Sequence, residues 1–396
     1  MRILFTRFPL ESALGGAEIQ TLSLMKGLSK HGHEVSFLGS CPILLKGVAD
    51  YGLRITELDI GNPPVTKWNA ISFFWRKAAM KKKLIRSLST YHLPLSTIVM
   101  LSLSEKLLLT EAAVKNGIKV FWIEHDSVGP WLTKNPWLPT LKKLSEKVTT
   151  ICVSELSRKI YIDLGWKPST VIAIPNGIDV GWFKPPPPNP LPPAGERGNS
   201  SSPSPSASRT SGGGGGRGEG VKLGCVARLS REKGVDLLIN AVTDLPNVSL
   251  TIVGTGPEEA RLHSLLSTIQ PSNHLTTPRI QILPTIPDIA SFYHSIDALV
   301  LPSRENDPFG LVAAEAMACG TPVIVTDQCG IAGYLKDEED TIIAKADSVD
   351  ALKKAIVHLQ DTAVRGRIAT AGRISAEKKF SEKTMIENYE QLLKTR

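Results

Sequence analysis

Short apolar strands alternate with amphipathic helices along both halves of this chain, and this alternation constrains the fold more than any other feature. It predicts strands near residues 3–8, 34–38, 96–101, 119–123, 150–153 and 171–174, and again near 222–226, 248–253, 280–283, 298–301 and 322–326. Such alternation is typical of α/β domains with parallel sheets. In these sheets ligands bind outside the carboxyl ends of the strands, where helix N-termini point. We therefore look for functional residues in the loops that follow the strands.

Residues 185–220 interrupt the alternation with a run dominated by Pro, Gly and Ser, in which Leu191 is the one large apolar residue. Such a segment cannot bury enough surface to offset the entropy of ordering it, so we expect a disordered linker. It divides the chain into a Rossmann-like domain over residues 1–184 and a second Rossmann-like domain over residues 221–380. Residues 381–396 are expected to form a C-terminal helix, which could pack back on the N-terminal domain.

The composition is that of an ordinary globular protein, with 42% hydrophobic and 21% charged residues in 396. The net charge of +8 suits an anionic ligand, an acidic membrane surface or nucleic acid and does not choose among them. The five cysteines are scattered, which favours buried thiols in a reducing cytoplasm. The chain begins on a strand, and no apolar run approaches the ~20 residues of a membrane span. We expect a cytoplasmic protein that could lie peripherally on the inner face of the membrane.

The strongest motif covers residues 301–323, where an apolar strand ends in a polar loop that opens a helix. Gly310 allows close approach of the backbone to a ligand, and the N–H groups of Phe309, Gly310 and Leu311 would form an anion site at the helix N-terminus. Asp307 and Glu315 can face one pocket as acceptors for sugar hydroxyls. The alternative is that Asp307 is a plain N-cap and Glu315 a solvated helix residue.

A second motif covers residues 224–234, where a strand runs into a loop that carries Arg228 and Lys233. A diphosphate at this strand end needs fixed cations to offset its charge. Arg228 can bind it in bidentate fashion, and Lys233 supplies a compact ammonium. The alternative is that both are solvated surface cations.

Three weaker signals also lie at expected strand ends. Gly254 and Gly256 form a strand–turn–helix junction, and Gly15 and Gly16 open a helix after the first strand. Each pair could let the backbone approach a ligand, or could serve only a tight turn. His125 follows an apolar strand at the edge where a cleft would lie, although a lone histidine is more often structural.

These stretches, in this order, resemble the signature motifs of the retaining GT-B glycosyltransferases, specifically the large family 4 (glycosyl transferases group 1). The resemblance covers both halves and omits only residues 185–220. It implies a GT-B fold, in which two Rossmann-like domains face each other across a cleft. Two departures stand out: Asp307 occupies the first acidic position, where it is one CH₂ shorter than the family's commonest residue, and Ala227 replaces a usual glycine.

The resemblance also implies the roles of the site residues. His125 and Asp307 would bind the donor sugar, Glu315 the ribose, and Arg228 and Lys233 the diphosphate. The remaining donor-binding positions are the two glycine loops, the helix N-terminus and the loop that reads the base: Gly15, Gly16, Gly254, Gly256, Thr285, Phe309, Gly310 and Leu311.

The implied activity is transfer of a hexosyl group, with retention of configuration, from a UDP- or GDP-sugar to a hydroxyl of a glycan or lipid-linked acceptor. Cell-surface polysaccharide or glycolipid synthesis is the expected setting. No DxD-type metal site is present, so we expect neither a metal nor a cofactor. No carboxylate pair resembles that of a glycoside hydrolase. A nucleotide-sugar-binding protein without turnover, a sugar phosphorylase or an epimerase remain alternatives, and a nicotinamide dehydrogenase lacks its glycine fingerprint after the first strand.

Aromatic and basic residues cluster over residues 73–83, and Trp131 and Trp137 lie in a second loop region. This combination suits a membrane interface. The alternative is a helix with a buried aromatic side and a solvated lysine side. No motif for nucleic-acid binding is present, and we expect no nucleic-acid partner.

Overall fold

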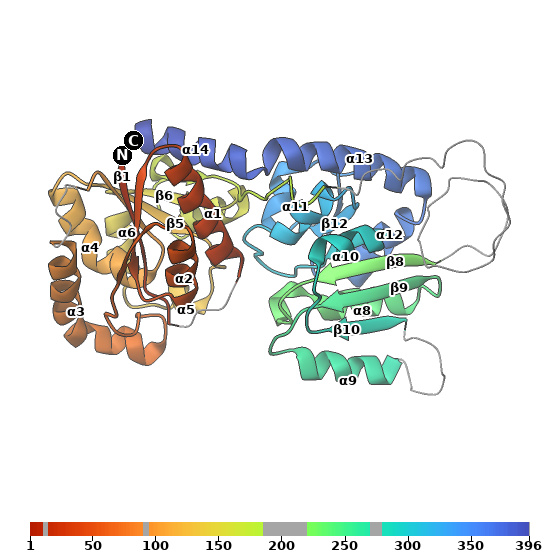
Figure 1. Ribbon diagram of the computed structural model, residues 1–396. Coiled ribbons are helices and arrows are strands. Elements are labelled where there is room, and N and C mark those ends of the chain that lie inside the picture. Colours follow the sequence, from red (N-terminus) through yellow and green to blue (C-terminus); the bar gives the residue numbers. More distant parts are fainter. Residues whose placement is uncertain (11–14, 90–94, 185–219, 270–278, 396) are drawn as a thin grey trace.

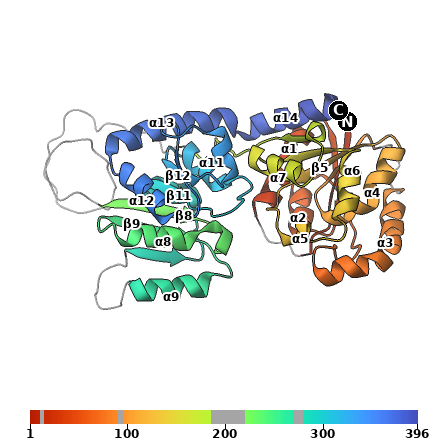
Figure 2. The ribbon, with the colours of Figure 1, turned by 180° about the vertical axis from the view of Figure 1, so that it is seen from behind.

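The computed structural model describes residues 1–10, 15–89, 95–184, 220–269 and 279–395. The expected linker over residues 185–220 lies outside this part except for Gly220. Two parallel sheets form separate lobes, and a long helical segment runs along one side of both (Figures 1 and 2). This is the GT-B arrangement that the sequence predicts.

The N-terminal sheet is parallel throughout, in the order β3-β2-β1-β4-β5-β6-β7. Its strands are β1 (Arg2–Arg7), β2 (Glu34–Gly39), β3 (Arg54–Glu57), β4 (Thr97–Met100), β5 (Lys119–Glu124), β6 (Thr149–Cys152) and β7 (Val171–Ala173). Its helices are α1 (Gly16–Lys30), α2 (Pro42–Asp50), α3 (Lys67–Leu88), α4 (Leu103–Lys115), α5 (Pro130–Thr133), α6 (Leu138–Ser145) and α7 (Glu155–Asp163), and η1 is a short 3-10 turn (Pro168–Thr170). The strand order reverses between β1 and β4, which opens a crevice at their carboxyl ends.

The second sheet is also parallel, in the order β10-β9-β8-β11-β12-β13. Its strands are β8 (Val221–Val226), β9 (Val248–Val253), β10 (Ile280–Leu283), β11 (Ala298–Leu301), β12 (Val323–Thr326) and β13 (Ile342–Ala344). Its helical segments are η2 (Arg231–Lys233), α8 (Val235–Thr243), α9 (Glu259–Ile269), α10 (Ile289–Ser295), α11 (Leu311–Ala318), η3 (Gly330–Tyr334), α12 (Val349–His358) and α13 (Thr362–Lys379). The reversal here lies between β8 and β11, so the motifs at 224–234 and 301–323 flank the second crevice.

The chain crosses between the lobes at two adjacent points. Ile178 N–H donates to Phe380 O at 2.7 Å, and Glu382 N–H donates to Ile178 O at 2.9 Å. Beyond the second crossing, α14 (Glu382–Thr395) packs against α1, where Ser23 Oγ donates to Glu382 Oε1 at 2.6 Å. The C-terminal helix thus returns to the N-terminal lobe and brings the two termini side by side (Figure 1).

Strand residues of each sheet are buried in apolar clusters on both faces, as parallel sheets require. The cysteines are free and buried, as the sequence predicts: Cys41, Cys152, Cys225, Cys319 and Cys329. No helix in the described part of the chain is long and apolar enough to cross a bilayer.

Candidate functional site

The two lobes meet through loops that follow their strands. Ser127, just after β5, donates from Oγ to Asn306 O of the second lobe at 2.9 Å. A Cβ atom added to Gly16, the first residue of α1, would lie 2.8 Å from Leu311 Cδ1 at the start of α11. The predicted glycine loop of the N-terminal domain, in which Gly15 is the N-cap of α1, therefore abuts the predicted anion site of the C-terminal domain.

The N-terminus of α11 offers backbone donors rather than side chains. Gly310 is the N-cap and has φ = +90°, and a Cβ atom there would lie 2.5 Å from Cys329 Sγ. Within the described residues, the N–H groups of Phe309, Gly310 and Leu311 donate no hydrogen bond. The Phe309 ring itself is buried and packs edge-on against Phe380, with ring centroids 5.6 Å apart. Phe309 thus anchors the turn in the core, and its free amide remains available to an anion.

Asp307 and Lys233 form an ion pair that the sequence analysis did not foresee. Lys233 Nζ lies 2.7 Å from Asp307 Oδ2, and Ser303 Oγ donates to the same oxygen at 3.0 Å. Burial alone would lower the pKa of Lys233, but the charge and hydrogen bond of Asp307 outweigh it and raise the pKa. The ammonium stays charged and is held at the carboxyl ends of β8 and β11.

Glu315 is not a solvated helix residue. It lies in α11 and accepts a hydrogen bond from the hydroxyl of Tyr293 in α10, at 2.7 Å. Burial raises the pKa of Glu315, and the hydrogen bond from Tyr293 opposes that shift only in part. Asp307 and Glu315 therefore have separate partners in the structure, Lys233 and Tyr293.

Arg228 is exposed, and its side chain makes no ion pair or hydrogen bond within the described residues. The turn with Gly254 and Gly256 supports its loop. A Cβ atom at Gly254 would lie 1.9 Å from Ala227 O, and one at Gly256 would lie 2.3 Å from Leu229 O. Packing of one loop on the other thus explains both glycines. Thr285, the position matched to the base-reading loop, lies exposed beyond β10.

His125 follows β5 in the N-terminal lobe, two residues before Ser127, which bonds the second lobe. Both of its ring nitrogens are buried and have no hydrogen-bond partner in the described part of the chain. Burial, followed by repulsion from Arg7 and Lys106, lowers the pKa of His125 to about 3. The imidazole is therefore neutral near pH 7 and can both donate and accept a hydrogen bond.

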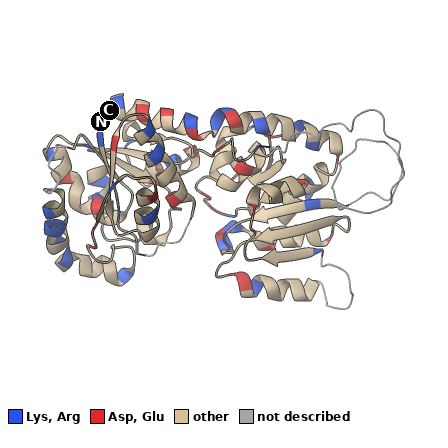
Figure 3. Ribbon diagram, viewed as in Figure 1, with Lys and Arg blue, Asp and Glu red and all other residues tan. Residues whose placement is uncertain are grey.

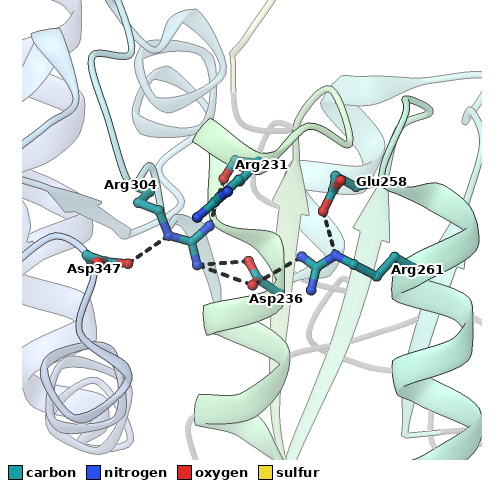
Figure 4. Close-up of polar contacts among 6 residues, drawn as sticks. All are labelled: Arg231, Asp236, Glu258, Arg261, Arg304 and Asp347. Carbon is teal, nitrogen blue, oxygen red and sulfur yellow. Dashed lines mark hydrogen bonds and ion pairs between the residues drawn. The ribbon is translucent and has the colours of Figure 1, made fainter.

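Arg304, within the 301–323 motif, is a site residue that the sequence analysis missed. Its guanidinium donates to both carboxylate oxygens of Asp236 at 3.2 Å, to Asp347 at 2.7 Å and to Arg231 O at 2.8 Å. Its backbone N–H donates to Glu232 O at 2.7 Å. Figure 4 shows Arg304 at the centre of this cluster, with Arg261 on the far side of Asp236. Arg304 thus fastens the β8–α8 loop, which carries Lys233, to the β11–α11 loop, which carries Asp307.

Family models match both lobes. Residues 215–375 match the family described as Glycosyl transferases group 1, and residues 14–182 match Glycosyltransferase Family 4. The chain belongs to the group 1 glycosyltransferases.

Curated relatives match part of this group 1 glycosyltransferase. One is the lipopolysaccharide core biosynthesis glycosyltransferase LpsE of Rhizobium meliloti (strain 1021), which is 30% identical over 169 residues. That alignment covers 42% of the chain and 48% of LpsE. Another is the D-inositol 3-phosphate glycosyltransferase of Mycobacterium marinum, which is 32% identical over 155 residues. That alignment covers 38% of the chain and 33% of the relative. The chain thus spans about half or less of the length of these relatives.

Solved structures extend the likeness over the whole chain at the level of fold. The crystal structure of Anabaena HepE in complex with UDP superposes with a TM-score of 0.76 at 18% identity, and the alignment covers 100% of both chains. The lipopolysaccharide glycosyltransferase WaaG superposes with a TM-score of 0.66 at 15% identity, over 100% of both chains. At these identities the likeness confirms the fold of the group 1 glycosyltransferase.

Proposed function

We propose that the chain is a retaining glycosyltransferase that transfers a hexosyl group from a UDP- or GDP-sugar to an acceptor hydroxyl. The proposal rests on one arrangement among the described residues. The N–H groups at the start of α11, which donate no hydrogen bond there, lie in the same lobe as the cations Arg228 and Lys233. His125, whose ring nitrogens have no partner among those residues, lies in the other lobe near a loop contact between the lobes. Such an arrangement can hold an anionic leaving group on one side of a sugar and a hydrogen-bonding group on the other.

In the proposed reaction the bond between the anomeric carbon and the phosphate oxygen breaks, and its electron pair leaves with the diphosphate. The acceptor oxygen bonds to the anomeric carbon on the same face, and the acceptor's proton passes to the departing phosphate oxygen. Arg228, Lys233 and the N–H groups at α11 offset the charge that develops on that phosphate. Asp307 holds Lys233 in place through the 2.7 Å contact.

The pKa of His125 supports its proposed place at the sugar rather than at the diphosphate. A neutral imidazole contributes hydrogen bonds and no charge, which suits a sugar hydroxyl. Glu315, held by Tyr293, is proposed to bind the ribose, and Asp307 the sugar. HepE, which has the same fold, is described in complex with UDP-glucose, and this supports a nucleotide-sugar donor here.

A contact with the membrane surface is proposed through α3. This helix carries seven Lys or Arg and no Asp or Glu, as Figure 3 shows by colour. Trp137, which the sequence also suggested for this interface, is buried and packs edge-on against the buried Phe73, with ring centroids 5.1 Å apart. Trp68, Phe74 and Trp75 are 77%, 52% and 76% exposed. Large exposed aromatic side chains beside cations match an anionic bilayer interface better than a helix with a buried aromatic side. The names of the relatives LpsE and the capsular glycosyltransferase CapM of Staphylococcus aureus support a role in cell-surface polysaccharide synthesis.

A thermal-shift screen of the purified protein against UDP-, GDP- and other nucleotide sugars tests the proposed function, because a donor that binds the folded state raises its apparent stability. The donor that binds is then incubated with candidate acceptors, and the anomeric configuration of the product is read by NMR. Transfer with retention supports the proposal. Binding without transfer or hydrolysis favours a non-catalytic binding protein, and strict dependence on inorganic phosphate favours a phosphorylase.

A further inference from the structure

The loop that carries Asp307 is held partly by the other lobe. Asp307 lies between Asn306 and Pro308, and the carbonyl oxygen of each neighbour accepts a hydrogen bond from a serine of the N-terminal lobe. Ser127 Oγ donates to Asn306 O at 2.9 Å. Ser157 Oγ, in the first turn of α7, donates to Pro308 O at 3.5 Å. The N-terminal lobe therefore contacts the backbone on both sides of Asp307.

The lobes pack closely on the Pro308 side of this loop. A Cβ atom at Gly330, the first residue of η3, would clash with Pro308 O and would lie 2.6 Å from Ser154 Oγ. Ser154 is the N-cap of α7, so Gly330 lies between a loop of its own lobe and a helix of the other. A side chain at this position would displace one of them, and this close packing fixes the Pro308 carbonyl at the boundary between the lobes.

The Ser127 contact falls on a residue with an unusual backbone conformation. The φ angle of Asn306 is +30°, a region that residues with a Cβ atom rarely adopt, although asparagine tolerates it better than most. Such a conformation persists only where the surrounding contacts hold it. Within the second lobe, Asp307 N–H donates to Gln328 O at 2.9 Å and fixes the residue that follows. The hydroxyl of Ser127 binds the carbonyl of Asn306 itself.

Ser127 also belongs to the loop that carries His125. It lies two residues beyond His125, and its carbonyl oxygen accepts a hydrogen bond from Trp131 Nε1 at 3.0 Å. The backbone of Ser127 is thus held by the N-terminal lobe, while its hydroxyl binds the second lobe. One side chain therefore links the loop of His125 to the loop of Asp307, the two residues that are proposed to bind the donor sugar from opposite lobes.

We propose that Ser127 is a positioning residue, which sets the Asp307 loop opposite His125 through the carbonyl of Asn306. The proposal rests on the proposed function and adds a residue to it that acts without touching the donor. Groups that bind a reacting sugar must be held within a fraction of an ångström of their productive positions. Loss of the Ser127 hydroxyl should therefore weaken the contribution of the sugar to binding. UDP and GDP carry no sugar beyond the ribose, so their affinity should hardly change.

Hydrogen exchange of the full-length protein, read by mass spectrometry, tests the contact without a ligand. Three amides bond across the loop, with Asp307 N–H donating to Gln328 O, Gly330 N–H to Asp307 O and Ile331 N–H to Phe309 O. In Ser127→Ala the peptides that contain these amides should exchange about three- to tenfold faster, because one hydrogen bond that restrains the loop is lost. Ser127→Thr keeps a hydroxyl and should exchange as the wild type does.

Ser23→Ala is the matched control. Ser23 Oγ also donates one hydrogen bond, to Glu382 Oε1 at 2.6 Å, where α14 returns to the N-terminal lobe. Within the described residues its hydroxyl bonds to neither the His125 loop nor the Asp307 loop. The exchange of the Asp307 loop should be the same in Ser23→Ala as in the wild type. A thermal melt of each variant confirms that it is folded.

Calorimetry on the same samples compares UDP with UDP-glucose and GDP with GDP-glucose. For the pair that binds, Ser127→Ala should weaken the nucleotide sugar about three- to tenfold and leave the nucleoside diphosphate within about twofold. Ser127→Thr should restore most of the loss. These results, together with the faster exchange, support the positioning role.

Unchanged exchange in Ser127→Ala, or equally fast exchange in Ser23→Ala, overturns the proposal. An equal loss of affinity for the nucleoside diphosphate and its sugar also overturns it, because Ser127 would then act on the nucleotide and not on the sugar side of the site. Wild-type protein that binds none of the four compounds counts against the proposed function instead. The exchange comparison then still decides whether Ser127 holds the Asp307 loop.

Discussion

Arg304 provides the sharpest test of how the donor site is held together. The residue joins the loops that carry Lys233 and Asp307, and its side chain is only 13% exposed. Arg304→Ala removes the contacts to Asp236 and Arg231 O, together with the contact to Asp347. The Asp347 contact is worth little, because that carboxylate is 66% exposed and exposed pairs contribute ~0–1 kcal/mol. Hydrogen bonds to charged groups are worth ~1.5–3 kcal/mol each, and Arg261 still neutralises Asp236. We therefore expect the β8–α8 loop to lose about 2–3 kcal/mol of its local stabilisation.

A ligand that needs this loop in place must restore its order on binding. We expect about half of the lost stabilisation, about 1.4 kcal/mol, to be added to the free energy of nucleotide binding as the cost of ordering the loop. The affinity for UDP or GDP then falls about tenfold. Calorimetry with UDP and GDP measures this directly, and near-UV circular dichroism monitors the fold. Arg304→Lys should lie between wild type and Arg304→Ala, because lysine keeps the charge but cannot reach three acceptors at once.

Arg261→Ala is the matched control. Arg261 forms an ion pair with Asp236, as Arg304 does, but its other partner is Glu258 rather than the backbone of the β8–α8 loop (Figure 4). The reasoning is refuted if Arg304→Ala binds nucleoside diphosphate as the wild type does. It is equally refuted if Arg261→Ala loses as much affinity for UDP or GDP as Arg304→Ala does. The loss would then follow from removing any positive charge near Asp236 and not from loosening the β8–α8 loop.

Further predictions concern the site and the surface. Glu315→Ala and Lys233→Ala should each lower transfer ~10²–10³-fold with unchanged far-UV circular dichroism, because each removes a preorganised polar group; near wild-type rates in both would exclude their roles. His125→Ala should lower the transfer rate at saturating donor more than it lowers UDP or GDP affinity, and the reverse pattern in rates and calorimetry would contradict its place at the sugar. The pKa of His125 is about 3 in the folded chain and 6.5 in an ordinary histidine. Between these two pH values the unfolded chain binds a proton at His125 that the folded chain does not, so the free energy of unfolding decreases as the pH falls from about 6.5 to about 3. Urea unfolding at about pH 7 and about pH 4.5 should accordingly show a smaller loss in His125→Asn than in the wild type. Sedimentation with anionic vesicles at low salt should be lost in a Trp68→Ser, Trp75→Ser double variant, and absence of wild-type sedimentation would reject the membrane contact.

The alternation of strands and helices was sufficient to predict both sheets, because buried parallel strands are continuous apolar runs. It missed β3 and β13, which are edge strands of four and three residues. β3 reads Arg-Ile-Thr-Glu and is too polar to stand out from a loop. The loops that follow the central strands could be predicted for the same reason. Each of these loops comes directly after a strand whose apolar residues make it easy to recognise in the sequence.

The partners of the site residues could not be predicted in the same way. Asp307 and Lys233 were expected to bind different parts of the donor, yet they pair with each other across 74 positions of sequence. Arg304 stood inside the strongest motif, but its significance comes from Asp236 and Asp347, which lie on other elements. Ion pairs between loops depend on strand order, and a single sequence carries no direct signal of that order.

The distribution of charge between the lobes gives each a distinct chemical task. In the second lobe Lys233 is paired with Asp307, but Arg228 is unpaired among the described residues. Among the same residues the N–H groups of Phe309, Gly310 and Leu311 donate no hydrogen bond, so Arg228 and these groups can offset the charge of a diphosphate. In the N-terminal lobe Arg7 and Lys106, whose charges help to lower the pKa of His125, are each paired with a carboxylate. A neutral hydroxyl beside the neutral His125 would need no counter-charge. This difference is consistent with the proposed arrangement, in which the second lobe holds the donor diphosphate and the acceptor hydroxyl lies near His125.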